Sequence, residues 1–224
     1  MGFSTYSAPA YPVNLVVAGA PALVVGGGHI GLRKVEGLLG SGALVTIVAP
    51  VVEFDGAALD VVHGLVRRGN VQWRRRRYRA GEAAEYRLVI SATGVREVDE
   101  QVYRDAVAAG VPVNVADVPS LCTFTLPAIV RRGDVQVAVS SNGRSPALAS
   151  WLRDQLADAL PSAIADALEL VAEVRAELKA SGQSTERVGW HEAFDSGFVQ
   201  LVAEGEREGA RELLRERLGL VGAS

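Results

Sequence analysis

Three glycines near the N-terminus follow a short apolar run with a spacing that suits the binding of phosphate groups. The run Ala22–Val25 ends in Gly26, and Gly28 and Gly31 complete a G-x-G-x-x-G pattern. The first glycine permits a sharp turn, the second lets backbone approach a pyrophosphate, and the third lets a helix pack closely on its strand. The free N–H groups and positive dipole end of that helix would face the phosphates. The pattern predicts a dinucleotide site.

A carboxylate follows a later apolar run and can act as an acid or base. Asp117 comes two residues after the end of the expected strand Val113–Val115. A carboxylate at the end of a buried strand can take up a proton during a reaction. A structural role competes with this interpretation, because Asp two residues before Pro119 is typical of an Asx-type turn. Position alone leaves both interpretations open.

The elements around these residues follow a repeating strand–helix order. Helical spacing after Gly31 stops at 40–42, and the apolar run Leu44–Val48 follows within the length of one βαβ unit. Further short strands and helices alternate up to Val115, which predicts an α/β fold with a Rossmann-like, doubly wound parallel sheet. Ligands of such sheets lie at the carboxyl ends of the strands. Thr93, after the expected strand Leu88–Ser91, would share that edge with Asp117.

The second strand of the predicted unit lacks the acid that usually holds the adenosine ribose. Asp or Glu is common there, whereas this chain has Val48-Ala49-Pro50. Backbone groups around Pro50 and Val51 would then hold the ribose. Since this strand end also lacks an arginine for a 2′-phosphate, the sequence favours NAD over NADP as the cofactor.

The strand–helix order ends after Asp117. Two expected strands, Leu121–Val130 and Val135–Ser140, would form a hairpin, and helical patterns fill most of the remaining chain. We therefore expect three parts: a dinucleotide-binding domain at 1–116, a strand-rich connector at 117–160 and a helical C-terminal domain at 161–224.

The bulk composition excludes several classes of protein. A net charge of −3 gives no general reason to expect nucleic-acid binding, and Arg74–Arg77 would alternate between the faces of an edge strand. The single cysteine, Cys122, excludes an internal disulfide framework, and the three histidines lack the spacing of a metal site. We expect no structural metal. Without a signal-peptide pattern or an apolar stretch of membrane length, we expect a cytoplasmic protein that does not enter membranes.

Four stretches together resemble one enzyme family. They are Tyr11–Val13 leading into the glycine turn with Arg33-Lys34 behind it; Gly42–Pro50; Val113–Cys122, continued by Phe124 and Pro127–Val130; and Ser140–Ala149. In this order they are similar to the precorrin-2 dehydrogenase/sirohydrochlorin ferrochelatase family of sirohaem synthesis. The resemblance covers about two thirds of the chain, and its last two stretches are the more specific ones.

The resemblance implies a reaction and an assembly. Members of the family use NAD to remove two hydrogens from precorrin-2, which gives sirohydrochlorin, and bifunctional members then insert Fe²⁺ as a substrate in the same cleft. The family has a Rossmann domain, a strand-rich dimerisation region and a helical tail, and its members are homodimers. We therefore expect a homodimer in which residues 117–160 contribute to dimerisation.

The resemblance also implies roles for individual residues. His29 and Ile30 in the glycine turn, and Pro50 and Val51 after the second strand, fall where the family contacts NAD. Asp117 falls on the key acidic residue of the family and would be the general base. Where the family often has acids, this chain has Gly94-Val95 and Val118. These departures bear more on metal insertion than on dehydrogenation.

A tetrapyrrole substrate carries many carboxylates, so its site needs cations and N–H donors. The turn formed by Ser141, Asn142, Gly143 and Arg144 precedes a helix that begins near Pro146 and can form an anion-binding nest. Arg131, with Arg132, is a second candidate. The competing interpretation is a capped helix start and solvated arginines.

Two other functions remain open from the sequence. A non-catalytic NAD-sensing module would need the glycine turn and the helices, but not an acid at Asp117. A dehydrogenase of another polycarboxylate would need the same residues, because composition and spacing do not identify a tetrapyrrole.

Overall fold

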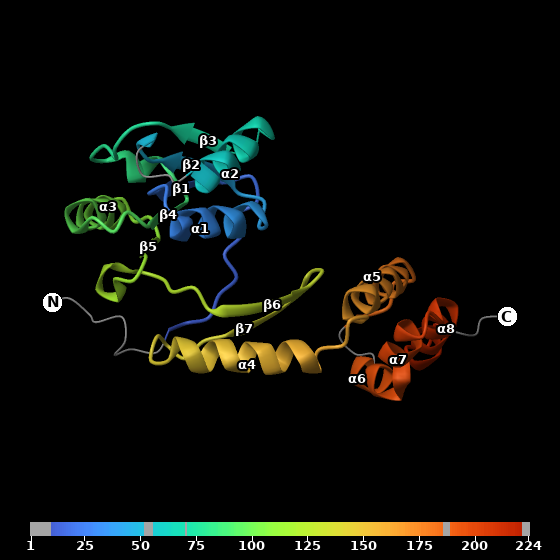
Figure 1. Ribbon diagram of the computed structural model, residues 1–224. Coiled ribbons are helices and arrows are strands. Elements are labelled where there is room, and N and C mark those ends of the chain that lie inside the picture. Colours follow the sequence, from blue (N-terminus) through green and yellow to red (C-terminus); the bar gives the residue numbers. More distant parts are fainter. Residues whose placement is uncertain (1–9, 52–55, 70, 186–188, 221–224) are drawn as a thin grey trace. The chain divides into compact units, whose positions relative to one another are not determined.

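The chain folds into two compact units. The computed structural model describes residues 10–51, 56–69, 71–185 and 189–220 (Figure 1). The first unit runs to Leu126 and includes Asn142–Arg144, and the second contains Pro127–Ser141 and the chain from Ser145 onward.

A five-stranded sheet forms the centre of the first unit. Its strands are β1 (Pro21–Val25), β2 (Leu44–Val48), β3 (Val71–Arg74), β4 (Leu88–Ser91) and β5 (Val113–Val115). They lie in the order β3-β2-β1-β4-β5, and every neighbouring pair is parallel (Figure 1). The predicted doubly wound sheet is confirmed. From β1 the chain adds β2 and β3 on one side of the sheet and then β4 and β5 on the other side. The carboxyl ends of β1 and β4 therefore form the switch point at which such folds bind ligands.

Helices cover both faces of this sheet. Helices α1 (His29–Leu39) and α2 (Gly56–Arg67) bury Val35 and Val62 in the core on one face. Helix α3 (Arg96–Ala108) buries Val102 and Ala106 in the core on the other face. Successive strand residues point to opposite faces, so β1 contributes to both cores and has to be apolar almost throughout. This burial on both faces fixes the sheet edge on which a ligand would lie.

Two strands differ from their expected bounds. The edge strand expected to carry Arg74–Arg77 ends at Arg74, where the Arg76 N–H donates to the Arg74 carbonyl and the chain turns toward the short helix η2 (Glu82–Glu85). The strand expected over Leu121–Val130 is also wrong in its first part. That segment begins in the 3₁₀ turn η3 (Pro119–Leu121), since proline favours such a turn, and a strand starts only at Ala128.

The first unit continues past 116, the predicted end of the dinucleotide-binding domain. The Thr123 N–H donates to the Val113 carbonyl at 2.8 Å, and the Asn114 side-chain amide donates to the Phe124 carbonyl at 3.0 Å. These bonds hold the chain after η3 against β5. The division at 116 and 160 stays a prediction about folding units.

Among the residues that the structure describes, the second unit contains an antiparallel hairpin and six helical segments. Strands β6 (Ala128–Arg132) and β7 (Val135–Val139) pair with each other and contact α4 (Pro146–Ala159). The helices that follow are α5 (Ile164–Ala180), α6 (Trp190–Ala193), the π-helical turn η4 (Phe194–Phe198), α7 (Val199–Ala203) and α8 (Arg207–Arg217). Leu170, Val174, Phe198 and Leu214 form their buried core. Across the described ranges, every helix is too short or too polar to cross a membrane.

Candidate active site

The glycine turn between β1 and α1 has the geometry that its spacing predicts. Gly26 has a φ of +108°, and a Cβ there would lie 2.3 Å from the Ala92 carbonyl oxygen. A Cβ on Gly31 would lie 2.6 Å from the Gly26 carbonyl oxygen. Both positions therefore need glycine, one for the turn and one for the close approach of α1 to it.

Gly28 differs from the other two glycines because it faces open space. Its backbone is extended, and a Cβ there would have no neighbour within 4 Å. The first turn of α1 carries no acidic residue, and its first two residues, His29 and Ile30, are exposed. An uncapped helix start beside an open glycine suits the pyrophosphate of a dinucleotide, so the residues present fit the group that the sequence predicts.

The chain after β2 offers backbone rather than side-chain acids. Pro50 is half-buried and Val51 is exposed. The Ala49 carbonyl accepts a hydrogen bond of 2.9 Å from the Trp73 indole N–H, and the Val48 carbonyl accepts one of 3.0 Å from the Gly26 N–H. These bonds fix the end of β2 next to the glycine turn, at the place where the adenosine ribose was predicted.

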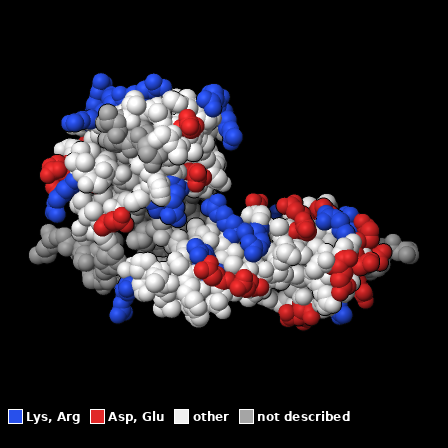
Figure 2. Space-filling model, in the orientation of Figure 1, with Lys and Arg blue, Asp and Glu red and all other residues white. Residues whose placement is uncertain are grey.

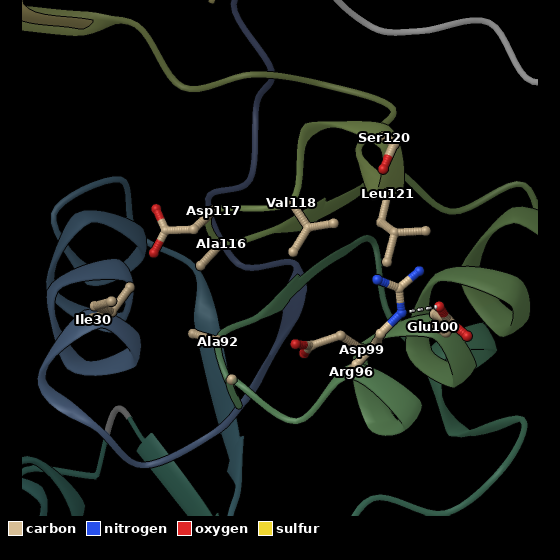
Figure 3. A pocket seen from close by; sticks show the side chains of 11 residues that line it. Ile30, Ala92, Arg96, Asp99, Glu100, Ala116, Asp117, Val118, Ser120 and Leu121 are labelled. Atoms are coloured by element: carbon tan, nitrogen blue, oxygen red, sulfur yellow. Dashed lines mark hydrogen bonds and ion pairs between the residues drawn. The ribbon is translucent and has the colours of Figure 1, made fainter.

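A cavity of about 330 Å³ opens at the carboxyl edge of the sheet (Figure 3). Its lining comes from the start of α1, the ends of β4 and β5, the first turn of α3, and η3. The residues are Ile30, Ala92, Gly94, Arg96, Asp99, Glu100, Ala116, Asp117, Val118, Ser120 and Leu121. The cavity thus brings together two predicted site residues, Ile30 and Asp117, while Thr93 lies between two lining residues in the chain.

Asp117 occupies an unusual backbone conformation in this cavity. Its φ is +60°, a left-handed value that Asp adopts more readily than most residues. Figure 3 shows its carboxylate beside Ile30, at the start of α1. Within the part of the chain that the structure describes, this carboxylate takes part in no hydrogen bond or ion pair, so the Asx-type bond of the competing interpretation is not formed. Asp117 is exposed in the lining of the cavity.

Side-chain hydrogen bonds hold the segment that carries Asp117. The Cys122 Sγ accepts from the Val115 N–H at 3.2 Å, and the Val113 N–H donates to Thr123 Oγ1 at 2.9 Å. Burial raises the pKa of the Cys122 thiol, with the Val115 hydrogen bond opposing it, so the thiol stays protonated. Cys122 therefore positions the backbone and is a poor nucleophile.

Sequence reasoning missed the part of the cavity formed by α3. Asp99 is only 3% exposed, and its Oδ1 accepts hydrogen bonds from Ser91 Oγ at 2.6 Å and Thr93 Oγ1 at 2.8 Å. This carboxylate fixes the turn after β4, including Thr93. Arg96 and Glu100 line the same cavity. In the sequence, this turn is indicated only by the acidic residues at 97–100, at the start of an expected helix. Such residues are common at helix starts because they interact favourably with the helix dipole, so they do not by themselves indicate a functional site.

The predicted anion-binding turn before α4 is built as a helix cap. The Ser145 Oγ accepts from the Leu148 N–H at 3.2 Å, and the Ser141 Oγ accepts from the Ser145 N–H at 3.0 Å. Asn142 and Gly143 have positive φ values, and Arg144 is exposed. Both serine hydroxyls are thus engaged locally, and substrate binding by this turn stays a prediction.

The remaining predicted residues concern cations and metals. Arg131 is exposed on β6, opposite Gln136 in the hairpin register. Among the residues that the structure describes, no three His, Cys, Asp or Glu side chains are grouped as they would be to hold a metal ion.

The parallel sheet, the glycine turn and the cavity at its carboxyl edge define a Rossmann-type nicotinamide-dinucleotide-binding protein. The model of a putative NAD(P)-binding family matches residues 13–128, and the model of the sirohaem biosynthesis protein central region matches residues 132–159. The chain belongs to this putative NAD(P)-binding family, and the match of its next segment to the sirohaem biosynthesis model agrees with the family that the sequence motifs indicate.

Curated relatives carry the name siroheme synthase. The protein of Methylococcus capsulatus is 41% identical over 145 residues, which cover 65% of this chain and 29% of the relative. The protein of Methylobacillus flagellatus is 34% identical over 211 residues, which cover 92% of this chain and 44% of the relative. The chain therefore spans less than half the length of these relatives.

A solved structure supports the fold. The precorrin-2 dehydrogenase SirC matches 92% of this chain over 98% of its own, with a TM-score of 0.68 and 24% identity. The agreement extends through both units of the chain, so the fold of the second unit is also one that a known protein adopts.

Proposed function

We propose that this protein is a precorrin-2 dehydrogenase that uses NAD⁺ to form sirohydrochlorin. The observation that carries the proposal is that one cavity is lined both by the start of α1, where the cofactor would bind, and by Asp117. The names of the relatives and of the structural neighbour support sirohaem synthesis as the pathway and a tetrapyrrole as the substrate class. A dehydrogenation needs both a hydride acceptor and a proton acceptor, and the cavity offers a place for each.

The bound cofactor would supply the hydride acceptor. The residues of the chain would do the rest: the backbone at Gly28 and the start of α1 hold the pyrophosphate, and Ile30 and Ala92 form apolar walls of the cavity. Asp117 accepts the proton that leaves the macrocycle. Precorrin-2 would lose one hydride, to the bound cofactor, and one proton, to Asp117, which would then pass that proton to water.

The choice of NAD over NADP rests on the end of β2. Pro50 and Val51 carry no cation for a 2′-phosphate, and the backbone after Val48 is fixed by the Trp73 hydrogen bond. We therefore propose NAD⁺ as the better substrate. The ratio of kcat/KM for NAD⁺ and NADP⁺ tests this directly, and a ratio below one would contradict it.

We also propose that the protein is a homodimer. Helix α4 buries only Ala149 among its residues and exposes an apolar stripe. Leu148, Trp151, Leu152 and Leu156 in this stripe are between 38% and 56% exposed, and they recur at helical spacing. A second copy of the chain would cover them. Light scattering should give the mass of a dimer, and Leu152→Asp should shift it toward that of the monomer.

Fe²⁺ insertion is the second activity that we would test in the same cavity. Insertion requires removal of two pyrrole N–H protons, and Asp117 would accept them as it accepts the proton of the first step. A cytoplasmic location of the whole reaction stays a prediction.

An anaerobic assay with precorrin-2 and NAD⁺ tests the proposal. We expect NADH and the absorption spectrum of sirohydrochlorin to develop in equal amounts, and added Fe²⁺ then tests insertion against the uncatalysed rate. NAD⁺ binding without any NADH formation would overturn the proposal and favour the sensing module. NADH formed only with another polycarboxylate would identify a different dehydrogenase.

A further inference from the structure

Arg96 lies on the far side of the cavity from Asp117, at the first position of α3 (Figure 3). Its side chain is 85% exposed and pairs with Glu100 at 2.9 Å. Among the described residues that line the cavity it is the one cation, against the three carboxylates of Asp99, Glu100 and Asp117. These carboxylates would repel an anionic ligand in the cavity, and Arg96 is the lining residue that would attract it.

Helix stability does not explain an arginine at this position. The positive end of the helix dipole disfavours cations in the first turn, where Glu97 and Asp99 are the favoured type of residue. The exposed pair with Glu100 contributes little, since both side chains remain accessible to water and salt. Ligand binding therefore explains an arginine at position 96 better than a contribution to the stability of the fold does.

The size and lining of the cavity indicate which ligand. About 330 Å³ is near the lower limit for a small-molecule site, so a macrocycle would enter by one edge only. Ala92, Ala116 and Val118 provide apolar walls between Asp117 and Arg96 (Figure 3). An apolar ring with carboxylates at its edge would place its reacting atoms at Asp117 and one carboxylate at Arg96.

We infer that Arg96 binds a peripheral carboxylate of the tetrapyrrole and so orients its reacting edge toward Asp117, an inference that rests on the proposed function. A guanidinium can hold a carboxylate through two parallel N–H donors, which fixes direction as well as distance. On binding, the carboxylate would compete with Glu100 for Arg96, and its charge would also be favoured by the start of α3.

Helix α3 contains a matched control. Arg104 also pairs with Glu100, at 3.9 Å, and its side chain is 60% exposed, but it does not line the cavity. Arg96→Gln and Arg104→Gln thus remove the same charge from the same helix and the same partner. Neither substitution removes a buried contact, so both variants should fold, which thermal unfolding verifies.

The experiment compares steady-state kinetics with precorrin-2 and NAD⁺ in the wild type and both variants. We expect Arg96→Gln to raise the KM for precorrin-2 about five- to tenfold, the loss of one partly exposed charge-assisted contact. Its kcat should also fall several-fold, because the reacting edge is less well oriented, while the dissociation constant of NAD⁺ should stay within about twofold. Arg104→Gln should leave all three unchanged. Arg96→Lys should recover part of the loss, and the KM of the wild type should rise more steeply with salt than that of Arg96→Gln.

Equal KM values for the two glutamine variants would overturn the inference, and so would a weaker NAD⁺ affinity in Arg96→Gln alone. Spectral titration with sirohydrochlorin separates this inference from the proposed function. If the wild type binds sirohydrochlorin without oxidising precorrin-2, weaker binding by Arg96→Gln would sustain the role of Arg96 while the activity fails. If the wild type binds no tetrapyrrole, both proposals fail.

Discussion

The two sides of the cavity are built in different ways. The glycine turn, residues 26–31, offers a ligand backbone N–H groups and open space at Gly28. The β5–η3 segment, residues 113–124, offers the side chain of Asp117 and is held by the side chains of Cys122 and Thr123. One side depends on residues that lack a side chain, and the other depends on particular side chains.

This difference separates binding from chemistry. A pyrophosphate has the same charge and shape in every dinucleotide, so backbone donors at a helix start suffice for it. Proton transfer needs one ionisable group at one place. Substitutions in the glycine turn should therefore affect stability and cofactor binding, and substitutions in the β5–η3 segment should affect turnover.

The largest effect should come from Asp117→Asn. The amide keeps the size of the side chain and removes its ability to accept a proton, so kcat should fall by about 10²- to 10⁴-fold. The dissociation constant of NAD⁺, measured by titration calorimetry, should stay within about twofold. A kcat near that of the wild type would show that Asp117 does not transfer the proton, and would contradict the assignment of turnover to the β5–η3 segment.

Gly26→Ala and Gly28→Ala should separate the roles within the glycine turn. The first places a Cβ 2.3 Å from a backbone oxygen at a φ of +108°, so we expect a loss of about 3 kcal/mol or more in the free energy of unfolding. The second meets open space and should cost less than about 0.5 kcal/mol. It should nevertheless weaken NAD⁺ binding about tenfold, because the Cβ occupies the approach to the pyrophosphate. Chemical denaturation and calorimetry measure both effects, and equal stabilities of the two variants would contradict the account.

Glu82 provides a reference for stability outside the cavity. Burial alone would raise the pKa of this carboxyl, but the hydrogen bonds from Arg76 and from the Arg79 backbone lower it below its ordinary value. A lowered carboxyl pKa stabilises the folded state above the pKa of the unfolded chain, near 4, and this stability is lost as the pH falls through the folded value. Glu82→Gln should cost about 2 kcal/mol at pH 7 and less at pH 3. Urea unfolding at both pH values checks this, and an equal cost at both would show that the charge is not involved.

The smallest effect should come from Thr123→Val. The change leaves the Val113 N–H without its Oγ1 acceptor and keeps the shape of the side chain, so unfolding should become easier by about 1 kcal/mol. Because this bond holds the β5–η3 segment, kcat should fall while NAD⁺ affinity stays unchanged. A Thr123→Ser variant keeps the hydroxyl and should restore kcat. An effect on NAD⁺ affinity instead would mean that the two sides of the cavity are not separable.

The sequence predicted the glycine turn and the sheet well because backbone geometry leaves a strong local pattern. Only glycine fits at Gly26 and Gly31, and strands buried on both faces must be apolar throughout. The end of the β5–η3 segment, from Leu121 onward, was wrongly expected to be a strand, because its apolar residues do not reveal that the chain after η3 folds back on β5. The wall formed by Asp99 and Arg96 was missed for a similar reason. Both residues line a cavity that forms only when α3 packs beside the sheet, and residue spacing along a helix does not predict such a cavity.

A crystal structure of the protein with NAD⁺ bound is the most direct test of the central claim that both sides of the cavity serve one reaction. The account predicts the pyrophosphate at Gly28 and the start of α1, with the nicotinamide ring in the cavity between Ile30 and Ala92 and its reactive face accessible from Asp117. A nicotinamide directed away from Asp117, or a dinucleotide bound elsewhere, would contradict it.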